Sequence, residues 1–449
     1  MNNDFHKTNG KRLFSGILFF VAAALFLLAP HAAVNVDEQL HYPHAKNVVN
    51  WYFTGGKDQS CLHTPQTNLK YYGQSVDNFT ALFNRVWNIE NEFLVRHYTG
   101  AFFFLLLLLF SGLLTREVTG SWMASGIVVM ALVFMPRLAG QAFGNLKDIP
   151  FAAGYVAGLL MIVRFLKEFP VLRWKTVLLL GLAIAFTISV RAGGFILFAY
   201  LGLVLMIYFI LKPYYFKQII TTRPVFVRLL AQGAAILVIG YFAGLLFWPY
   251  ALQNILIHPV ESLRVMEHYK VSIRQVFEGE LMWSTQLPWY YLPKWLLISS
   301  PLIPLIGFIL FIGYYFKKIF FSQSIDRQIL LEGFILFSFI FPLVYVMIID
   351  SNLYSGIRQM LFILPSMTIL SVWGVFTLLG HLAKRIRFIY YFVMVVFAAG
   401  LLWPLKHQAT TFPVDYVYFN LLAGGNKKAW SNYEYDYYFH GVKQAVDYL

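Results

Sequence analysis

The sequence is poor in charged residues and in cysteine. Charged residues make up 12% of the 449 positions, about half of the roughly 25% found in ordinary soluble proteins. The single cysteine, Cys61, excludes an intramolecular disulfide. The sequence contains no Walker motif, no dinucleotide-binding glycine motif and no internal repeat, so neither ATP-driven transport nor nicotinamide chemistry is supported.

Hydrophobic residues, in contrast, are abundant. They make up 59% of the chain, and the mean hydropathy is +0.62. Apolar runs of about twenty residues, the length of a helix that crosses a bilayer, recur from Leu13 to Pro404. The runs do not alternate as β-barrel strands do. We therefore expect an all-α polytopic membrane protein of about eleven transmembrane helices: 13–31, 98–114, 119–136, 149–164, 176–191, 194–211, 229–248, 296–316, 329–349, 359–380 and 388–404.

The basic residues indicate how the chain is oriented. The net charge of +14 is spread over short loops, which argues against a nucleic-acid-binding domain. With a cytoplasmic N-terminus, eighteen of the 35 basic residues fall beside helix ends on the inside, as the positive-inside rule expects. They are Lys7, Lys11, Arg12, Arg116, Arg164, Lys167, Arg173, Lys175, Lys212, Lys217, Arg223, Arg228, Lys317, Lys318, Arg327, Lys384, Arg385 and Arg387.

This orientation leaves three long segments on the outer side. They are the first outer loop, about 32–97, a second loop, about 249–295, and the tail 405–449. The predicted organisation is thus a transmembrane catalytic module, 1–404, followed by an extracytoplasmic tail. Long loops on a rigid scaffold commonly carry function.

Two acidic motifs lie on the outer loops. Asp37 and Glu38 follow the first span, and Asp148 follows Lys147 just before the fourth. Each acidic residue has a purely structural explanation, because carboxylates stabilise the N-terminal ends of helices. The functional alternative is a general base that removes a proton from an attacking group. Asp37, His41 and His44 are also spaced to share one helical face and to bind a metal, although Pro43 makes a continuous helix there doubtful.

Four basic residues are expected at the outer ends of helices. Each could reach lipid headgroups on its own, and together they suit an anionic lipid phosphate. They are Arg137, Lys147, Arg191 and Arg358. Gly193 and Gly194 would let a headgroup approach the backbone beside Arg191.

An aromatic segment, 283–295, precedes the eighth span. It includes Trp289, Tyr290 and Tyr291. An interfacial aromatic belt would explain it without any function. The alternative is a sugar or lipid groove.

These motifs together resemble the GT-C type of membrane glycosyltransferases, and within it the protein-mannosyltransferase-like group called glycosyltransferase family 39. The resemblance covers most of the chain. It rests on three motifs: an Asp-Glu signature followed by His41 and Tyr42, a Lys147-Asp148 element, and an Arg-Ala-Gly-Gly turn. The stretches concerned are 36–42, 145–151, 191–194, 286–294, Arg358, 417–420 and 434–438. The repeat domain inserted in eukaryotic relatives is missing, which favours a bacterial member.

The resemblance implies an inverting hexosyl- or pentosyltransferase in the cell inner membrane. Its donor would be a sugar on undecaprenyl or dolichyl phosphate, and its extracytoplasmic acceptor, a lipid, glycan or protein, is unknown. Asp37 would be the base, with Asp148 and Glu38 as further catalytic carboxylates. Arg191, Arg358, Lys147 and Arg137 would bind the phosphate, and the groove would be lined by His41, Tyr42, Trp289, Tyr290 and Tyr291. The chemistry requires no cofactor, although a divalent metal is compatible with it.

A protein of another class would explain the same topology. A flippase or transporter for lipid-linked glycans would also bind an anionic lipid, but such carriers often have two related halves with interrupted helices. The sequence shows no such repeat. A non-catalytic lipid-binding relative is the other alternative.

Overall fold

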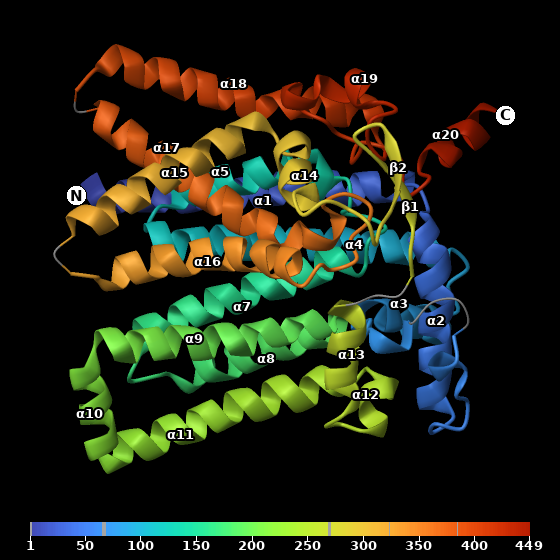
Figure 1. The fold of residues 1–449 in the computed structure, drawn as a ribbon, viewed down its shortest axis with the longest axis horizontal. Coiled ribbons are helices and arrows are strands. Elements are labelled where there is room, and N and C mark those ends of the chain that lie inside the picture. Colours follow the sequence, from blue (N-terminus) through green and yellow to red (C-terminus); the bar gives the residue numbers. More distant parts are fainter. Residues whose placement is uncertain (1, 65–68, 268–270, 323, 384) are drawn as a thin grey trace. The chain divides into compact units, whose positions relative to one another are not determined.

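The computed structural model describes residues 2–64, 69–267, 271–322, 324–383 and 385–449, without the side chains of residues 2–8 and Asp447. Helices dominate it (Figure 1). Lys384 and the side chain of Lys7, two of the predicted cytoplasmic charges, lie outside the described residues. So do 65–68 and 268–270, in the two predicted outer loops.

The apolar helices agree with the predicted spans. Within the described ranges, nine helical stretches are long and apolar enough to cross a membrane, and two shorter apolar helices accompany them. In chain order these eleven are Asn9–His31, Glu92–Thr119, Trp122–Val133, Asp148–Glu168, Trp174–Val190, Ala192–Leu211, Arg223–Ala243, Leu302–Phe321, Arg327–Ile348, Arg358–Ala383 and Arg387–Thr411. Each overlaps one predicted span, so the expectation of an all-α polytopic membrane protein is confirmed.

The chain divides into two compact units. Unit 1 comprises Met1–Gln39, Arg96–Ile149 and Glu267–Leu449, and unit 2 comprises Leu40–Val95 and Pro150–Met266. The division falls within α2 (Val36–Phe53), α4 (Glu92–Thr119), α7 (Asp148–Glu168) and α13 (His258–Glu267).

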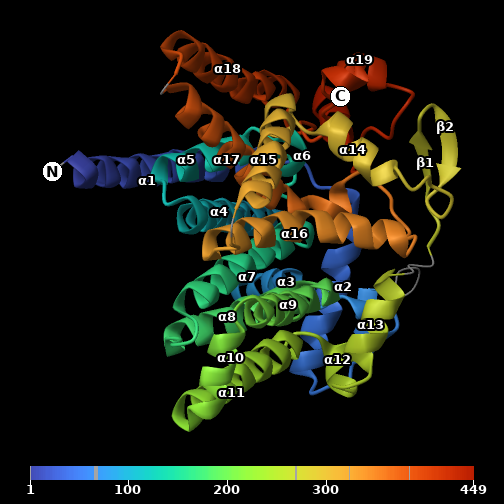
Figure 2. The same cartoon turned by 60° about the vertical axis from the view of Figure 1, so that its left-hand side comes forward.

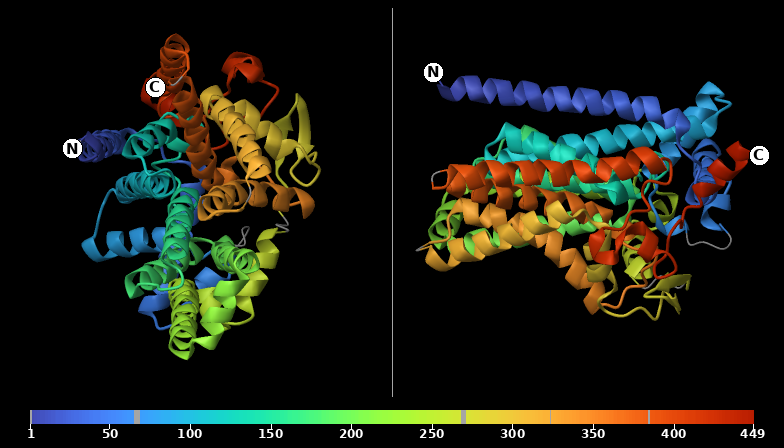
Figure 3. Two further views of the ribbon diagram at one scale, coloured as in Figure 1. Left: turned by 90° about the vertical axis from the view of Figure 1, so that its left-hand side faces the viewer. Right: turned by 90° about the horizontal axis from the view of Figure 1, so that it is seen from above.

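Unit 1 contains most of the long helices. They are α1 (Asn2–Leu28), α5 (Trp122–Val133), α6 (Pro136–Ala139), α14 (Tyr291–Ser299), α15 (Leu302–Phe321), α16 (Arg327–Ile348), α17 (Leu364–Ala383) and α18 (Arg387–Thr411). Short helices η1 (Ala29–His31), η6 (Arg358–Ile363), η7 (Leu421–Ala423), α19 (Gly425–Ala429) and α20 (Gly441–Tyr448) complete it. The start of α1, the ends of α15 and α17 and the starts of α16 and α18 lie at one end of this unit (Figures 1 and 3). The β-hairpin, α14 and the C-terminal tail lie at the other.

Small residues allow α15 and α17 to pack closely. A Cβ atom at Gly374 would lie 2.4 Å from the carbonyl oxygen of Gly307, and one at Gly307 would lie 2.2 Å from Oγ of Ser371. In a bilayer, helix association depends on such contacts, because lipid is as apolar as the helix surface.

A β-hairpin in the second outer loop is among the elements that the hydropathy does not predict. Strand β1 (Arg274–Phe277) pairs antiparallel with β2 (Glu280–Trp283). The two-residue turn has positive φ angles at Glu278 (57°) and Gly279 (83°), as a type I′ hairpin requires. Phe277 also forms a bridge with Tyr433, which attaches the hairpin to the tail.

Unit 2 is built mainly from helices of the middle of the chain. Helix α8 (Trp174–Val190) packs against α11 (Arg223–Val238) and the π-helical segment η5 (Ile239–Ala243) that continues α11 (Figure 2). The remaining elements are η2 (Ser60–Leu62), η3 (Leu69–Tyr71), α3 (Ser75–Trp87), η4 (Ala192–Phe195), α9 (Ile196–Leu211), α10 (Pro213–Thr221) and α12 (Pro249–Gln253).

The doubt about a continuous helix at Pro43 was wrong. Helix α2 runs without interruption from Val36 to Phe53 with Pro43 inside it. Proline lacks the N–H that would bond to the carbonyl of Gln39, and its ring crowds that carbonyl, but α2 continues past it.

Candidate active site

Asn35 fixes the start of α2 and thereby the first acidic motif. Its Oδ1 accepts a hydrogen bond from the backbone N–H of Glu38 (2.9 Å), and its own N–H donates to Oε2 of Glu38 (3.1 Å). This reciprocal arrangement is a capping box, which satisfies N–H groups that a helix start leaves unpaired. Asp37 lies between the two capping residues on the first turn.

Glu38 is enclosed on the inner side of this turn. Its side chain is fully buried, and its Oε1 lies 3.2 Å from Nε of Arg96, which is equally buried. Nε2 of His97 lies 3.5 Å from its other oxygen. A Cβ atom at Gly144 would approach that oxygen to 2.7 Å, so the absence of a side chain there lets the second acidic loop lie against the capping box.

Asn145 organises the second acidic motif in the same way. Its Oδ1 accepts a hydrogen bond from the backbone N–H of Asp148 (2.8 Å), the first residue of α7, and so satisfies an N–H group that the helix start leaves unpaired. Its Nδ2 donates to Oδ2 of Asp148 (3.0 Å) and to the hydroxyl of Tyr438 (3.0 Å). The Asp148 side chain is thus buried and held by a residue of the turn that precedes α7.

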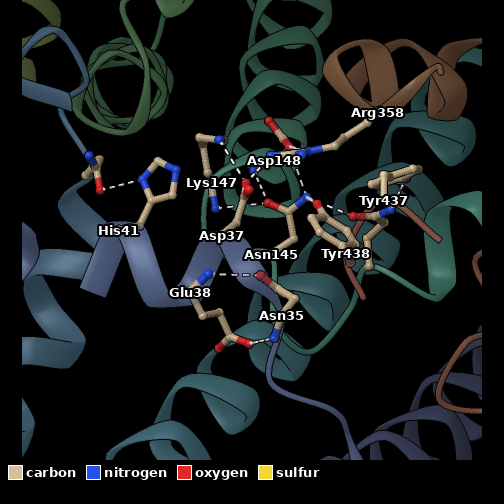
Figure 4. Close-up of polar contacts among 12 residues, drawn as sticks. Asn35, Asp37, Glu38, His41, Asn145, Lys147, Asp148, Arg358, Tyr437 and Tyr438 are labelled. Carbon is tan, nitrogen blue, oxygen red and sulfur yellow. Dashed lines mark hydrogen bonds and ion pairs between the residues drawn. The ribbon is translucent and has the colours of Figure 1, made fainter. Parts of the chain in front are cut away.

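Asp37, Lys147, Asp148 and Arg358 meet in one cluster (Figure 4). Nζ of Lys147 lies 3.4 Å from Oδ2 of Asp37, and Nη2 of Arg358 donates to the same oxygen. Nε of Arg358 lies 3.4 Å from Oδ2 of Asp148. Asp37 keeps 21% of its side-chain surface exposed, whereas Asp148 keeps 4% and Arg358 6%. A partly accessible carboxylate is therefore flanked by two cations, a pairing able to bind both a phosphate and a hydroxyl or amine.

Two tyrosines of the C-terminal tail cover Arg358. Its guanidinium carbon lies 4.8 Å from the ring centre of Tyr438 and 5.9 Å from that of Tyr437. The hydroxyl of Tyr437 accepts from Nε2 of Gln141 (2.9 Å). Burial raises the pKa of both tyrosines, so each hydroxyl stays protonated. The tail thereby contributes to the cluster from the far end of the sequence.

Arg137 serves a different part of unit 1. It is 2% exposed, its Nε donates to the carbonyl oxygen of Tyr418 (3.2 Å), and its guanidinium carbon lies within 5.0 Å of the ring centres of Trp295 and Phe419. These contacts attach the tail to α14. Glu434, also in the tail, is half-buried, and the partial loss of water around its carboxylate raises its pKa to about 7.

Unit 2 holds the remaining predicted cation, Arg191. It ends α8, and its guanidinium carbon lies 5.9 Å from the ring centre of Tyr72 and 5.6 Å from that of Phe151. The glycine beside it has a packing role, because a Cβ atom at Gly194 would lie 2.5 Å from the backbone nitrogen of Ile188.

The histidines and Tyr42 of α2 are engaged within unit 2. Nδ1 of His41 is hydrogen-bonded to Oε1 of Gln74 (2.9 Å), and Nδ1 of His44 to Oγ1 of Thr64 (2.8 Å). Burial lowers the pKa of His44 to about 4, which keeps its ring neutral. Tyr42 packs in a small core with Ala45, Val49 and Ala81. In the part of the chain that the structure describes, no group of three or more His, Cys, Asp or Glu residues is arranged to hold a metal ion.

The aromatic residues of the second outer loop take three different positions. Trp289 is 71% exposed, whereas Tyr291 is buried and donates to Oε1 of Gln275 (2.6 Å). Tyr290 donates to Oε2 of Glu278 in the hairpin turn (3.0 Å). Only Trp289 presents most of its ring to the surroundings.

Comparison with known proteins gives matches in structure but not in sequence. No protein-family model matches the chain, and a search of curated proteins finds no significant match. The apo oligosaccharyltransferase of Archaeoglobus fulgidus aligns with 96% of this chain, with 13% identity and a TM-score of 0.58. The chain spans 57% of the length of that protein.

Two further solved structures are similar. The oligosaccharyltransferase AglB of Archaeoglobus fulgidus, in complex with an inhibitory peptide and a dolichol-phosphate, aligns with 94% of this chain over 56% of its own (13% identity, TM-score 0.55). The ArnT protein of Cupriavidus metallidurans, bound to undecaprenyl phosphate, aligns with 91% of this chain over 74% of its own (14% identity, TM-score 0.52). On this evidence the chain has the GT-C fold of membrane glycosyltransferases.

Proposed function

We propose that the protein is an inverting glycosyltransferase that moves a hexosyl or pentosyl unit from a polyprenyl phosphate to an extracytoplasmic acceptor. The observation that carries the proposal is the partly exposed carboxylate of Asp37 between Lys147 and Arg358. A phosphate requires cations and an acceptor requires a base, and this cluster brings both together.

Asp37 is the base in this proposal. The bond between the anomeric carbon and the phosphate oxygen breaks, the acceptor oxygen or nitrogen forms the new bond from the opposite side, and Asp37 takes the acceptor's proton. The phosphate leaves with the bonding electrons. Because the phosphate competes with Asp37 for Lys147 and Arg358, donor binding would free the carboxylate to accept a hydrogen bond from the acceptor.

Arg358 and Lys147 stabilise the leaving phosphate. A guanidinium has five N–H donors, and the two carboxylates occupy Nε and Nη2 of Arg358. Asp148 orients this side chain, and Tyr438 covers it. Preorganised charges of this kind stabilise a transition state without having to rearrange. Arg191 remains a proposed phosphate partner, on the resemblance of its Arg-Ala-Gly-Gly turn.

Three residues that the sequence predicted to contact the substrates are assigned supporting roles instead. Glu38 is buried in the capping box and positions Asp37, Arg137 attaches the tail, and Tyr42 packs in the core of unit 2. His41 and Tyr290 stay proposed groove residues. The mechanism requires no cofactor, and a divalent metal stays compatible with it.

The polyprenyl chain would lie among apolar helix faces, and the protein would be placed in the cell inner membrane with the cluster outside. ArnT, which shares the fold, was solved with undecaprenyl phosphate. This similarity supports a donor carried on a lipid monophosphate.

Donor specificity tests the proposal. Purified protein in proteoliposomes is supplied with polyprenyl-phosphate sugars or with sugar nucleotides, together with a membrane extract as the source of acceptors. We expect sugar transfer, with release of polyprenyl phosphate, only from the lipid donors. Transfer from a nucleotide sugar alone would contradict the proposal, and so would movement of the intact lipid-linked sugar across the bilayer without any transfer, the result expected of a flippase.

A further inference from the structure

A cavity of about 270 Å³ lies in unit 1 between the segment before α14 and the end of α16. Its walls are both polar and apolar. The polar side includes Thr285, Asp350 and Ser351, and the apolar side includes Trp289, Leu292 and Met347. The volume is slightly below the roughly 300 Å³ at which pockets for drug-sized ligands begin. It therefore suits a ligand of one or two small rings.

The chemistry of the walls matches a saccharide. A sugar ring has one apolar C–H face and an edge of hydroxyl groups. Trp289, 71% exposed, offers a large flat surface to that face. The Asp350 carboxylate can accept hydrogen bonds from hydroxyls, and the hydroxyls of Thr285 and Ser351 can donate and accept them. A tryptophan that only anchored the protein in lipid headgroups would not need a carboxylate in the same cavity, since carboxylates are costly near the bilayer.

The cavity is connected to the cluster through the backbone of unit 1. The loop 349–357, which supplies Asp350 and Ser351, leads directly into Arg358. The hydroxyl of Tyr291, another lining residue, accepts from the backbone N–H of Gly356 (3.0 Å). A ligand in the cavity would therefore contact the segment that positions Arg358.

We propose that this cavity binds a sugar unit of the acceptor, so that the acceptor is a glycan or a glycolipid. That the bound sugar belongs to the acceptor rests on the proposed function. Binding of a sugar in the cavity, however, requires neither donor nor turnover. A lipid tail would require a continuous apolar groove, and this cavity is half polar. The cavity thus selects the acceptor, whereas the cluster binds the donor phosphate.

Binding can be measured directly by saturation-transfer NMR of methyl hexosides and methyl pentosides with the purified full-length protein. The variants are Trp289→Ala and Asp350→Asn, and the control is Trp430→Ala, a tail tryptophan with a similar exposure of 65% outside the cavity. Asp350 has a positive φ of 50°, a conformation that asparagine tolerates, so Asp350→Asn should fold.

We expect at least one glycoside to bind to the wild type and to Trp430→Ala, and to bind about tenfold more weakly to both cavity variants. Equal binding by wild type and Trp289→Ala would overturn the proposal. No binding of any glycoside at millimolar concentration, or binding of unglycosylated peptides in their place, would overturn it too. A failed donor assay would leave these results unchanged, so the two proposals fail separately.

Discussion

At the scale of single residues, Arg358 joins the two acidic loops. One nitrogen of its planar fork faces Asp148 and another faces Asp37. A lysine would bring the same charge but a single donor centre on a flexible stem. The position therefore requires the shape of arginine as well as its charge. Its burial beneath Tyr438 keeps the fork in place.

Arg358→Lys tests this requirement. We expect donor affinity to fall about tenfold or more, because a bidentate, charge-assisted contact with phosphate is replaced by a single one. The measurement is a binding titration with a polyprenyl-phosphate sugar. Arg387→Lys is the matched control, since Arg387 is exposed at the start of α18. Unchanged affinity in Arg358→Lys would remove Arg358 from the phosphate site.

Glu434 makes the stability of the fold depend on pH. Burial raises its pKa from 4.5 to about 7. Between these values the folded chain holds a proton that the unfolded chain has released, so raising the pH through this window weakens the fold, by at most about 1.4 kcal/mol per pH unit. Its stabilising contribution is complete below about pH 4.5 and is lost as the pH rises to about 7.

Glu434→Gln, which cannot ionise, should therefore melt at a higher temperature than the wild type at pH 8. Its melting temperature should also vary less between pH 5 and 7. A residual slope is expected from Asp415, whose pKa burial also raises to about 7. Thermal melting in detergent measures this, with Glu280→Gln on the exposed hairpin as the control. Parallel pH profiles for wild type and Glu434→Gln would contradict the argument.

Some residues of the cluster could be predicted from the sequence and others could not. Four residues could be predicted because they are charged and lie in short motifs beside predicted spans, where charged residues are rare and easily noticed. They are Asp37, Lys147, Asp148 and Arg358. Tyr438 lies in a tail where tyrosines are common, and only the folded chain brings it to Arg358. The capping box could have been found in the sequence, because Asn35 precedes Glu38 by three residues.

At the scale of elements, the contact of α15 with α17 depends on two glycines. A methyl group at Gly374 would overlap the Gly307 carbonyl, whereas one at Gly380, on the same helix, has nothing within 4 Å. We expect Gly374→Ala to destabilise the protein by about 1–3 kcal/mol. Gly380→Ala should be neutral or slightly stabilising, since alanine favours helix. Melting temperatures decide this, and equal values for the two variants would contradict the close packing.

The sequence predicted the helices better than the outer segments. A membrane-spanning helix is specified by its own apolar run, which explains the agreement over all eleven predicted spans. The hairpin β1–β2 depends instead on a turn at Gly279 and on contact with the tail, neither of which hydropathy detects. Some helix boundaries also differ from the predicted ones. For example, α18 continues to Thr411, past the end of its apolar run.

At the scale of the whole molecule, the proposal requires one orientation in the membrane. The segment 32–97 and the tail must face outward, and the α15–α16 turn must face the cytoplasm. In a Cys61→Ser background, Gln59→Cys and Lys427→Cys should react in intact cells with an impermeant thiol reagent. Ser324→Cys should react only after permeabilisation. All three positions are exposed. The opposite pattern would reverse the topology.

The central claim is that Asp37 takes a proton from the acceptor while cations beside it bind the donor phosphate. The most direct test is Asp37→Asn, which keeps the shape of the side chain and removes the base. With a polyprenyl-phosphate sugar as donor, turnover should fall by about 10²–10⁴-fold. Donor binding should not weaken, because the phosphate no longer competes with a carboxylate for Lys147 and Arg358, and the melting temperature should stay close to wild type. Near-normal turnover of Asp37→Asn would contradict the account and would make Asp148 the base to test.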